Sequence, residues 1–558
     1  MPSATSNSKN AGKVAGLRYW MLRVLDECDF APDPVHDLRV ALRRCRSMAD
    51  GLIAMDPDPA WKAMKKAGKR LFQRLGTLRD IHIMIDWIEK LAPAEEAEEN
   101  VGQATVALVH PSASSGHALA LLRPSEQYSE AIPSSAGPQA SSVDPAAHAL
   151  LQILARREEE QKHEAHSALE EFDRKQWRQW AKSLPQRAAR IRPGSALFKH
   201  LALERWTEAR RLHQIAMRNR SQTALHQLRI GIKRFRYIVE NFLPAEHAAW
   251  SSDLKKMQDL LGEVHDLDVL WDTAVAAQVF PSVDSRRQWH KVVLDERSQR
   301  IMEYHEKMVG PDSLWHVWRA ALPEGKQIPA LATRRMKLWA NALDPDFAHS
   351  ERVAALALQL HDGLVAAGLL PAPDGIGARS SLQAAALLHD IGKSKGKKGH
   401  HKISLDLIKS HGTPLGWKPE DMHRAAVVAR FHCGALPTKG HKALRDLLPN
   451  EQKVTIQLAA ILRLANAFDA AHNGHIRRVR VETEAGRNGR TNGFLRRCAN
   501  GPARNEAVIV AAEGYTPSDA TAQAIAAERH LLEMVLHRPV VVRAMKTQAT
   551  RNALLQIR

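Results

Sequence analysis

Cysteine and aromatic residues are both scarce in this chain of 558 residues. The four cysteines, at positions 28, 45, 433 and 498, are scattered and form no CxxC pair. This spacing argues against a disulfide framework and against a cysteine-based zinc site, and it favours a reducing compartment. Aromatic residues make up only 5% of the chain, which disfavours a base-stacking surface for single-stranded nucleic acid.

Long apolar runs are also missing. The N-terminal sequence MPSATSNSKNAGK has no apolar segment of the kind that a signal peptide requires. Nowhere does the chain reach the roughly 18 consecutive apolar residues of a membrane-spanning helix. We therefore expect no signal peptide, no membrane partner and a cytoplasmic location.

Positive charge, by contrast, is abundant. Lys and Arg number 80 against 61 Asp and Glu, which gives a formal net charge of +19. Such an excess favours a polyanionic partner. Nucleic acid, an anionic membrane and polyphosphate fit this charge equally well, so the choice among them depends on other features.

Helical periodicity dominates most of the chain, from residue 13 to about 90, from 146 to about 321, and in a further block that ends near His472. Residues 93–145 are rich in Ala, Ser, Pro and Glu, and we interpret them as a flexible insertion. Residues 322–332 are predicted to form a linker.

The C-terminal segment has a different character. Strands are predicted over 477–484, 506–514 and 539–545, with a helix over 521–537. The predicted fold class is therefore mainly α, with two helical parts and a small α+β tail. We expect three domains, at residues 1–325, 326–480 and 481–558.

An internal repeat is the most informative feature of the sequence. HDLRVALRRCRS begins at His36 and HQLRIGIKRFRY at His226, and a second pair of matching blocks begins at Lys69 and Lys255. Within the second pair, Gly76 matches Gly262, Asp80 matches Asp266, and the dibasic pair Lys69–Arg70 matches Lys255–Lys256. Two motifs that recur in the same order indicate a duplicated helical unit.

On a helix, the first block of each copy places four cationic or potentially cationic groups in one stripe beside an apolar face. The stripes consist of His36, Arg39, Arg43 and Arg46 in the first copy and of His226, Arg229, Lys233 and Arg236 in the second. The apolar faces consist of Val35, Leu38, Leu42, Cys45 and Ala49, and of Leu225, Leu228, Ile232, Phe235 and Val239. Most charged runs are simply solvated helix faces.

Here, however, the like charges repel one another by a few tenths of a kcal/mol per pair at i,i+4, and the arrangement occurs twice. That repetition favours a bound polyanion over a plain surface. Four cations at helical spacing span about 15 Å, which suits a linear phosphate chain better than one mononucleotide. Arginine can make paired hydrogen bonds to phosphate, and lysine adds point charge.

These motifs resemble those of the CHAD family, the conserved histidine α-helical domain, over about residues 13–320. The resemblance implies two pseudo-symmetric helical bundles around a basic groove that binds inorganic polyphosphate. The implied ligands are His36, Arg39, Arg43, Arg46, Lys69, Arg70, His226, Arg229, Lys233, Arg236, Lys255 and Lys256. Arg79 of the first copy is replaced by His265 in the second. Asp80 and Asp266 could orient basic side chains, or act as helix caps or structural salt bridges.

A second group of histidines and aspartates lies towards the C-terminus. It includes His349, the segment LLHDIGKSKGKKGHHK with His389, Asp390, Lys393, His400 and His401, then His432, Asn466 and Asp469. Imidazole and carboxylate groups suit a transition-metal ion or Mg²⁺. The five lysines of residues 393–402 could contact phosphate or could belong to a solvated loop.

This series resembles the HD superfamily of phosphohydrolases, and more closely the helical C-terminal domain of exopolyphosphatase/guanosine-pentaphosphatase proteins. The resemblance implies metal ligands at His349, His389, Asp390 and His432, with Mg²⁺ or Mn²⁺ as the metal, and catalytic candidates Asp390 and Lys393. Asp469, one turn after Asn466, is a candidate substitute for the last carboxylate ligand. Asn466 stands where the HD pattern expects an aspartate, which would weaken a metal site. The actin-like pair of domains that carries the chemistry in those proteins has no counterpart here, so this part could serve in binding and dimerisation.

We therefore expect an inorganic polyphosphate-binding protein that is located on polyphosphate granules. Its HD-like domain is the candidate surface for a homodimer. The alternative is a metal-dependent HD phosphohydrolase that acts on polyphosphate or a nucleotide, with the CHAD domain as substrate anchor. Nucleic-acid binding is disfavoured by the low aromatic content.

Overall fold

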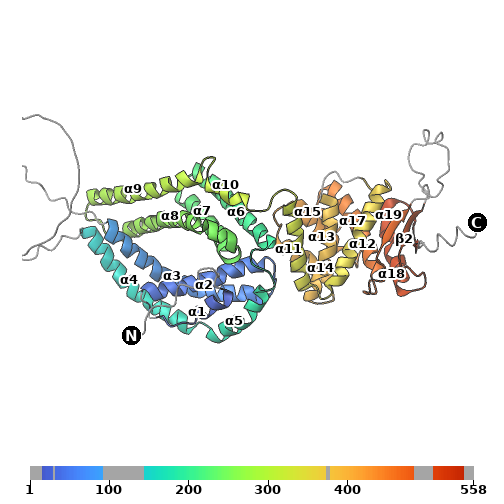
Figure 1. The fold of residues 1–558 in the computed structure, drawn as a ribbon, viewed down its shortest axis with the longest axis horizontal. Helices are drawn as coiled ribbons and strands as arrows, with labels where there is room; N and C mark the ends of the chain where they lie inside the picture. The colour runs from blue at the N-terminus through green and yellow to red at the C-terminus, as the bar shows by residue number, and fades with distance from the viewer. Residues whose placement is uncertain are drawn as a thin grey trace, which may run out of the picture.

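The computed structural model describes residues 16–28, 30, 32–91, 144–371, 377–482 and 507–545. Almost all of the predicted insertion at 93–145 lies outside these residues. Helices make up nearly all of the regular structure, apart from a three-stranded sheet near the C-terminus (Figure 1). The expected mainly α class with a small α+β tail is therefore confirmed. Among the helices of these segments, none combines the length and apolar character needed to cross a membrane.

The N-terminal half contains two similar sets of helices. The first set is α1 (Leu17–Arg23), α2 (Pro32–Ile53), α3 (Pro59–Leu91), α4 (Pro145–Glu170) and α5 (Arg174–Ala188). The second set is α6 (Ala196–Arg218), α7 (Gln222–Phe242), α8 (Pro244–Ala276), α9 (Val283–Met308) and α10 (Leu314–Ala320). Helices α3 and α8 each have 33 residues, and α4 and α9 each have 26. The duplication thus extends from the motifs to the helix lengths.

The core of this half is built by the predicted apolar faces of α2 and α7. Every one of their ten residues is at most 5% exposed. The two helices approach closely at Gly51, where a Cβ atom would lie 2.4 Å from Cε2 of Phe242. Phe242 is itself stacked on Phe198 at 4.1 Å between ring centroids. Burying the apolar faces against each other leaves the two charged stripes on the adjoining surfaces.

The C-terminal half begins with a helical part. Its elements are α11 (Gln327–Leu343), α12 (Phe347–Ala366), α13 (Gly377–Leu388), the 3₁₀ helix η1 (Ile391–Ser394), α14 (His400–His411), α15 (Pro419–Arg430), α16 (Lys442–Arg445) and α17 (Pro449–Phe468). The predicted linker at 322–332 is wrong in its second part, because α11 already begins at Gln327. Leu331 and Ala332 are buried there, so packing of their side chains outweighs the turn-forming composition.

The tail consists of β1 (Val479–Glu482), β2 (Val508–Ala512), α18 (Ala520–Glu528), α19 (His530–Leu536) and β3 (Val540–Ala544). Strand β1 pairs antiparallel with β2, and β2 pairs parallel with β3. The three predicted strands are confirmed, and the predicted helix is divided in two at Arg529. One apolar core contains residues of both the sheet and the helices around α12 and α17. The predicted boundary at 480/481 falls within β1.

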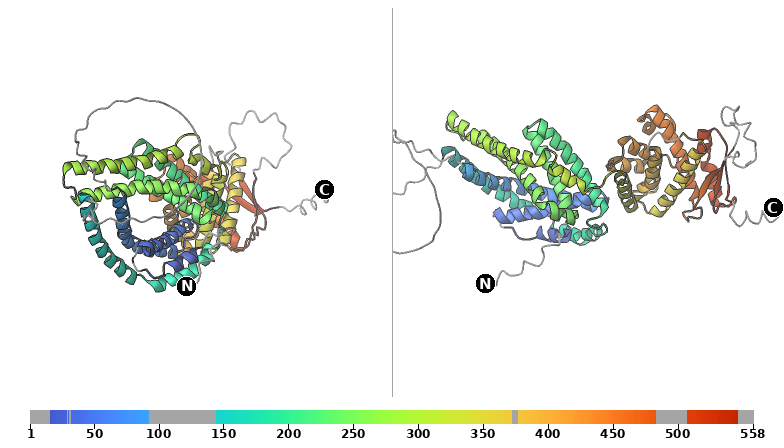
Figure 2. Two further views of the ribbon diagram at one scale, coloured as in Figure 1. Left: turned by 60° about the vertical axis from the view of Figure 1, so that its left-hand side comes forward. Right: turned by 45° about the horizontal axis from the view of Figure 1, so that its top comes forward.

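The two halves meet where α6 faces α11 and the loop that follows α14 (Figure 2). The Arg335 guanidinium lies 2.7 Å from Glu204, and the backbone N–H of Leu415 donates to the same carboxylate at 3.0 Å. His200 is fully buried between them. Its Nε2 donates to the Leu415 carbonyl at 3.0 Å, so its Nδ1 accepts from Arg335 at 2.9 Å. A neutral imidazole satisfies both contacts.

Candidate functional site

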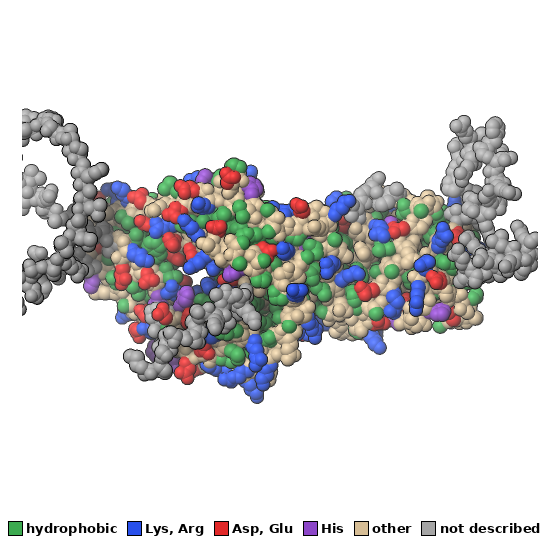
Figure 3. All heavy atoms as spheres, viewed as in Figure 1, with side chains coloured by type: hydrophobic (Ala, Val, Ile, Leu, Met, Phe, Trp, Pro, Cys, Tyr) green, Lys and Arg blue, Asp and Glu red, His purple; other side chains and the backbone are tan. Residues whose placement is uncertain are grey.

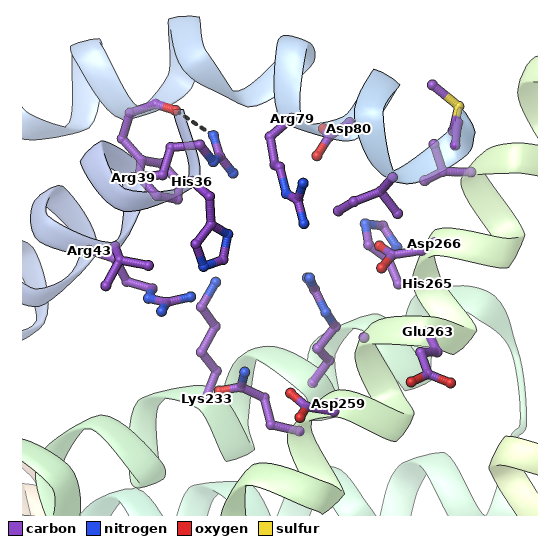
Figure 4. Close-up of a pocket in the computed structure, with 18 residues that line it drawn as sticks. His36, Arg39, Arg43, Arg79, Asp80, Lys233, Asp259, Glu263, His265 and Asp266 are labelled. Atoms are coloured by element: carbon purple, nitrogen blue, oxygen red, sulfur yellow. Dashed lines mark hydrogen bonds between the residues drawn. The ribbon is translucent and has the colours of Figure 1, made fainter. Parts of the chain in front are cut away.

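A cavity of about 490 Å³ lies between the two repeats of the N-terminal half. Side chains of α2 and α3 line one wall, and side chains of α7 and α8 line the other, as Figure 4 shows. In the space-filling view, a hollow is visible in this half with charged and histidine side chains around it (Figure 3). We call this cavity the groove. Its lining residues include His36, Arg39, Arg43, Arg79, Asp80, Arg229, Lys233, Asp259, Glu263, His265 and Asp266.

The groove brings together part of the predicted ligand set. His36, Arg39 and Arg43 reach it from the first stripe, and Arg229 and Lys233 reach it from the second. None of these five side chains forms an ion pair with any residue in the described part of the chain. Their charges are therefore available to a ligand.

The remaining predicted ligands lie elsewhere. Arg46 lies over the Phe72 ring at 4.7 Å, Arg236 lies 3.8 Å from Glu240, and His226 packs on His265 at 4.7 Å between ring centroids. The dibasic pairs are exposed on α3 and α8. Lys255 and Lys256 line a separate hollow beside the groove, where the Lys256 ammonium is 3.8 Å from Glu303.

The matched glycines of the repeat lie against the arginines of the stripes. A Cβ atom on Gly76 would lie 3.4 Å from Nη1 of Arg39, and one on Gly262 would lie 4.0 Å from Nε of Arg229. Both are ordinary van der Waals distances, so the two copies place an arginine in the same position beside the matched glycine. Arg39 is also held by a hydrogen bond of 3.0 Å to the Phe72 carbonyl and lies over the Phe72 ring.

Like charge and burial act together on the groove cations. Burial and the field of Arg229 lower the pKa of Lys233 to about 7. Burial, with Arg79 and Arg43, lowers the pKa of His36, and burial with Arg229 lowers that of His226. A fall of this kind means that burial and like charge outweigh the effect of any nearby anion, which would raise the pKa.

The acids of the groove compensate these cations only in part, as Asp80 does for Arg39. Asp80 and Asp266 lie in the middle of α3 and α8, so neither is a helix-start cap. Neither forms an ion pair with any residue that the structure describes. Burial raises the pKa of both carboxyls, that of Asp266 to about 6. Among the described residues, Asp80 and Asp266 therefore act neither as helix caps nor in salt bridges. That they orient nearby basic side chains stays a prediction.

Some groove residues were absent from the predicted ligands. Arg79 and His265 were noted only as a difference between the two copies, although both line the groove. Their position directly before the matched aspartates was the available signal. Asp259 and Glu263 carry no such signal in the sequence. They line the groove only because they lie on the same face of α8 as Asp266, at intervals of about one helical turn.

The histidines and aspartates of the C-terminal half also converge. His349 of α12, His389 at the end of α13 and Asp390 are buried, and each offers a ligand atom within 4.8 Å of the others. Nε2 of His389 and Oδ1 of Asp390 are buried without hydrogen-bond partners among the described residues. The Lys393 ammonium pairs with the other oxygen of Asp390.

Asn466 and Asp469 take different places around His349. Nε2 of His349 lies 2.9 Å from Oδ1 of Asn466, and Nδ1 lies 2.7 Å from Oδ2 of Asp469. Asp469 also accepts from Arg352 at 2.9 Å. Asp469 therefore lies behind His349, where a carboxylate orients a metal-binding imidazole, and Asn466 faces the cluster. Imidazole, carboxylate and amide donors with two unpartnered buried atoms fit a divalent metal.

The duplicated helices around a basic groove, joined to a helical part with buried histidines, define a two-part helical protein. Residues 11–275 match the CHAD domain family, and residues 334–498 match the family described as Ppx/GppA phosphatase, domain III. The chain is thus similar to a CHAD domain in its N-terminal half and to domain III of Ppx/GppA phosphatases in its C-terminal half. These two domain types point to a function related to polyphosphate.

Among solved structures, the crystal structure of the CHAD domain from the plant Ricinus communis is similar to this chain. The identity is 16%, the match covers 55% of this chain and 88% of that one, and the TM-score is 0.32. No curated protein matches the chain significantly.

Proposed function

We propose that the groove binds inorganic polyphosphate as an extended chain. The observation that carries this proposal is the convergence of unpaired cations from both repeats, Arg39 and Arg43 on one wall and Arg229 and Lys233 on the other. Their mutual repulsion disfavours the empty groove, and a polyanion between the walls removes it. A cytoplasmic protein held on polyphosphate granules is the corresponding cellular role.

A linear phosphate chain is favoured over nucleic acid for two reasons. The groove is lined by side chains of two facing helix pairs rather than by an exposed convex surface. In addition, Phe72 is the only aromatic side chain among the lining residues, and Arg39 already covers its ring, so bases have little on which to stack.

The test is a charge-matched comparison of binding. The double variant Arg39→Ala/Arg229→Ala should bind long-chain polyphosphate about 3–6 kcal/mol more weakly than the wild type, at about 1.5–3 kcal/mol per charged hydrogen-bonding group. The control double variant Arg178→Ala/Arg286→Ala loses the same charge at exposed positions outside the groove. It should bind nearly as the wild type does at moderate salt.

Two results would contradict the proposal. Equal weakening in both double variants would show that net charge alone drives binding. Tighter binding to duplex DNA of matched charge at the same salt concentration would make nucleic acid the ligand.

A second function, a metal-dependent phosphohydrolase, is favoured by the two unpartnered buried atoms of His389 and Asp390. His349, His389 and Asp390 would hold Mg²⁺ or Mn²⁺, with Asn466 nearby, and the metal would supply Lewis acidity and activated water. Lys393 would hold phosphate near Asp390. Wild-type protein should then release phosphate from polyphosphate or a nucleotide only with metal, and Asp390→Ala should abolish both release and metal binding. Absence of release from the wild type would leave binding as the sole function.

A further inference from the structure

A second group of metal-ligand side chains lies beside the first in the C-terminal half. It consists of His400 at the start of α14 and of His432 and Cys433 directly after α15, and we call it the His–Cys cluster. Nε2 of His400 and Nε2 of His432 are 3.0 Å apart, and Sγ of Cys433 lies 3.8 Å from Nε2 of His400. His400 and Cys433 were absent from the predicted metal ligands.

The backbone decides which nitrogen of each ring carries a proton. Nδ1 of His400 lies 2.9 Å from the Lys397 carbonyl, and Nδ1 of His432 lies 2.8 Å from the Ala429 carbonyl. A carbonyl oxygen only accepts hydrogen bonds, so each Nδ1 must donate. If both rings are neutral, each Nε2 therefore carries a lone pair, and the two lone pairs face each other with the nitrogens 3.0 Å apart. Only a cation between or beside them makes this contact favourable.

The spacing of the cluster matches the dimensions of a tetrahedral zinc site. Zinc bonds of about 2.0–2.1 Å to nitrogen and about 2.3 Å to sulfur place N···N about 3.3 Å and N···S about 3.6 Å apart. The corresponding distances here are 3.0 and 3.8 Å. These two distances therefore differ from those of a zinc site by only a few tenths of an ångström.

A fourth donor is available from Asp390. Its Oδ1 lies 3.2 Å from Nε2 of His400 and 3.6 Å from Nε2 of His432. This oxygen is buried and has no aligned hydrogen bond to any described residue. Two imidazoles, a thiolate and one carboxylate oxygen form a donor set that suits Zn²⁺, whereas Mg²⁺ requires mainly oxygen ligands.

The turn that carries two of these ligands is rigidly supported. The buried guanidinium of Arg463 donates to the Phe431 carbonyl and to the Gly434 carbonyl, each at 3.1 Å. These two carbonyls flank His432 and Cys433 on either side. Such outer contacts hold metal ligands in position and add to the affinity.

We propose that His400, His432, Cys433 and Asp390 bind Zn²⁺. This site is independent of polyphosphate binding in the groove. It shares Asp390 with the magnesium or manganese position suggested by His349 and His389, and it differs from that position in its other ligands and in the metal. The thiolate is the feature that separates the two.

The test uses the full-length protein, freed of metal by chelator and titrated with Zn²⁺ and with Co²⁺ as a spectroscopic substitute. Wild-type protein should take up stoichiometric zinc, and the Co²⁺ form should show a sulfur-to-cobalt charge-transfer band. Cys433→Ser should abolish that band and weaken zinc binding at least roughly 100-fold. The threshold is set there because loss of a residue that only supports a ligand weakens metal binding by up to about 100-fold. Cys28→Ser, in the N-terminal half, is the matched control and should behave as the wild type.

Several outcomes would overturn the proposal. These are a wild-type protein without stoichiometric zinc, a cobalt form without the charge-transfer band, or a band that persists in Cys433→Ser. If no zinc binds, the cation between the imidazoles is a proton, with His400 charged against Asp390. A band that persists in Cys433→Ser would assign the thiolate ligand to another cysteine. Circular dichroism of metal-free Cys433→Ser and His400→Gln should match that of the metal-free wild type, so that lost binding is not misread as unfolding. Phosphate release is measured separately, because its absence says nothing about the thiolate site.

Discussion

At the scale of single residues, the protonation of Lys233 links the groove to pH. Its pKa of about 7 means that a large part of the empty protein carries a neutral lysine near neutral pH. A bound polyanion favours the charged form and raises this pKa, so binding takes up a proton above about pH 7. His36 and His226, whose pKa values are also lowered, add proton uptake at lower pH. All three groups act in the same direction.

Affinity for long-chain polyphosphate should therefore rise as the pH falls from about 8 to about 6. Lys233→Arg keeps its charge throughout this range, so it should flatten the dependence between about pH 7 and 8. The measurement is a binding titration at constant ionic strength. Long chains are needed because the end phosphates of short chains titrate in the same range and with the opposite effect. An equally steep dependence in Lys233→Arg would assign the proton uptake to other groups.

At the scale of helices, periodicity and repetition were sufficient to predict α2 and α7 correctly. Both apolar faces are buried as expected, because a period of 3.6 residues fixes which side chains share a face. The same reasoning placed all eight stripe residues together, but only five of them line the groove. A single helix cannot reveal that Phe72 of α3 covers Arg46, because that contact depends on how α3 packs. Glu240, by contrast, follows Arg236 by one turn of the same helix, so their proximity could have been read from the sequence.

The C-terminal cluster shows a similar limit. The resemblance to the HD superfamily predicted that His349, His389 and Asp390 converge, and the structure brings them together. The sequence offered Asp469 as a substitute for Asn466, although the two lie on different sides of His349. A shift of three residues at the end of a helix changes the direction in which the side chain points. The sequence alone does not resolve that direction. Cys433 was set aside because it lacks a CxxC partner, whereas the fold supplies its neighbours from another helix.

At the scale of the whole molecule, the contact between α6 and α11 holds the two halves together. Arg335 is 5% exposed and depends on Glu204 for its counter-charge. Glu204→Ala should leave this guanidinium buried and unpaired and should destabilise the junction by about 3–5 kcal/mol. We expect the thermal unfolding of the variant to separate into two transitions, and protease cleavage between α10 and α11 to become faster.

A compensating variant distinguishes loss of the ion pair from general damage. In Glu204→Ala/Arg335→Met no buried charge remains, so much of the lost stability should return. A double variant as unstable as Glu204→Ala would show that the hydrogen bond from Leu415 to Glu204, rather than the charge of Arg335, is the important contact.

The buried junction also has a consequence for encounter frequency. His200, Glu204 and Arg335 fix the C-terminal half to α6. A polymer bound in the groove would therefore be held at a fixed distance from the histidines that follow α11. A free end of such a polymer would meet those histidines at an effective concentration set by the length of the chain. That concentration would not change when the protein is diluted. Polymers too short to reach from one site to the other would gain nothing from the connection.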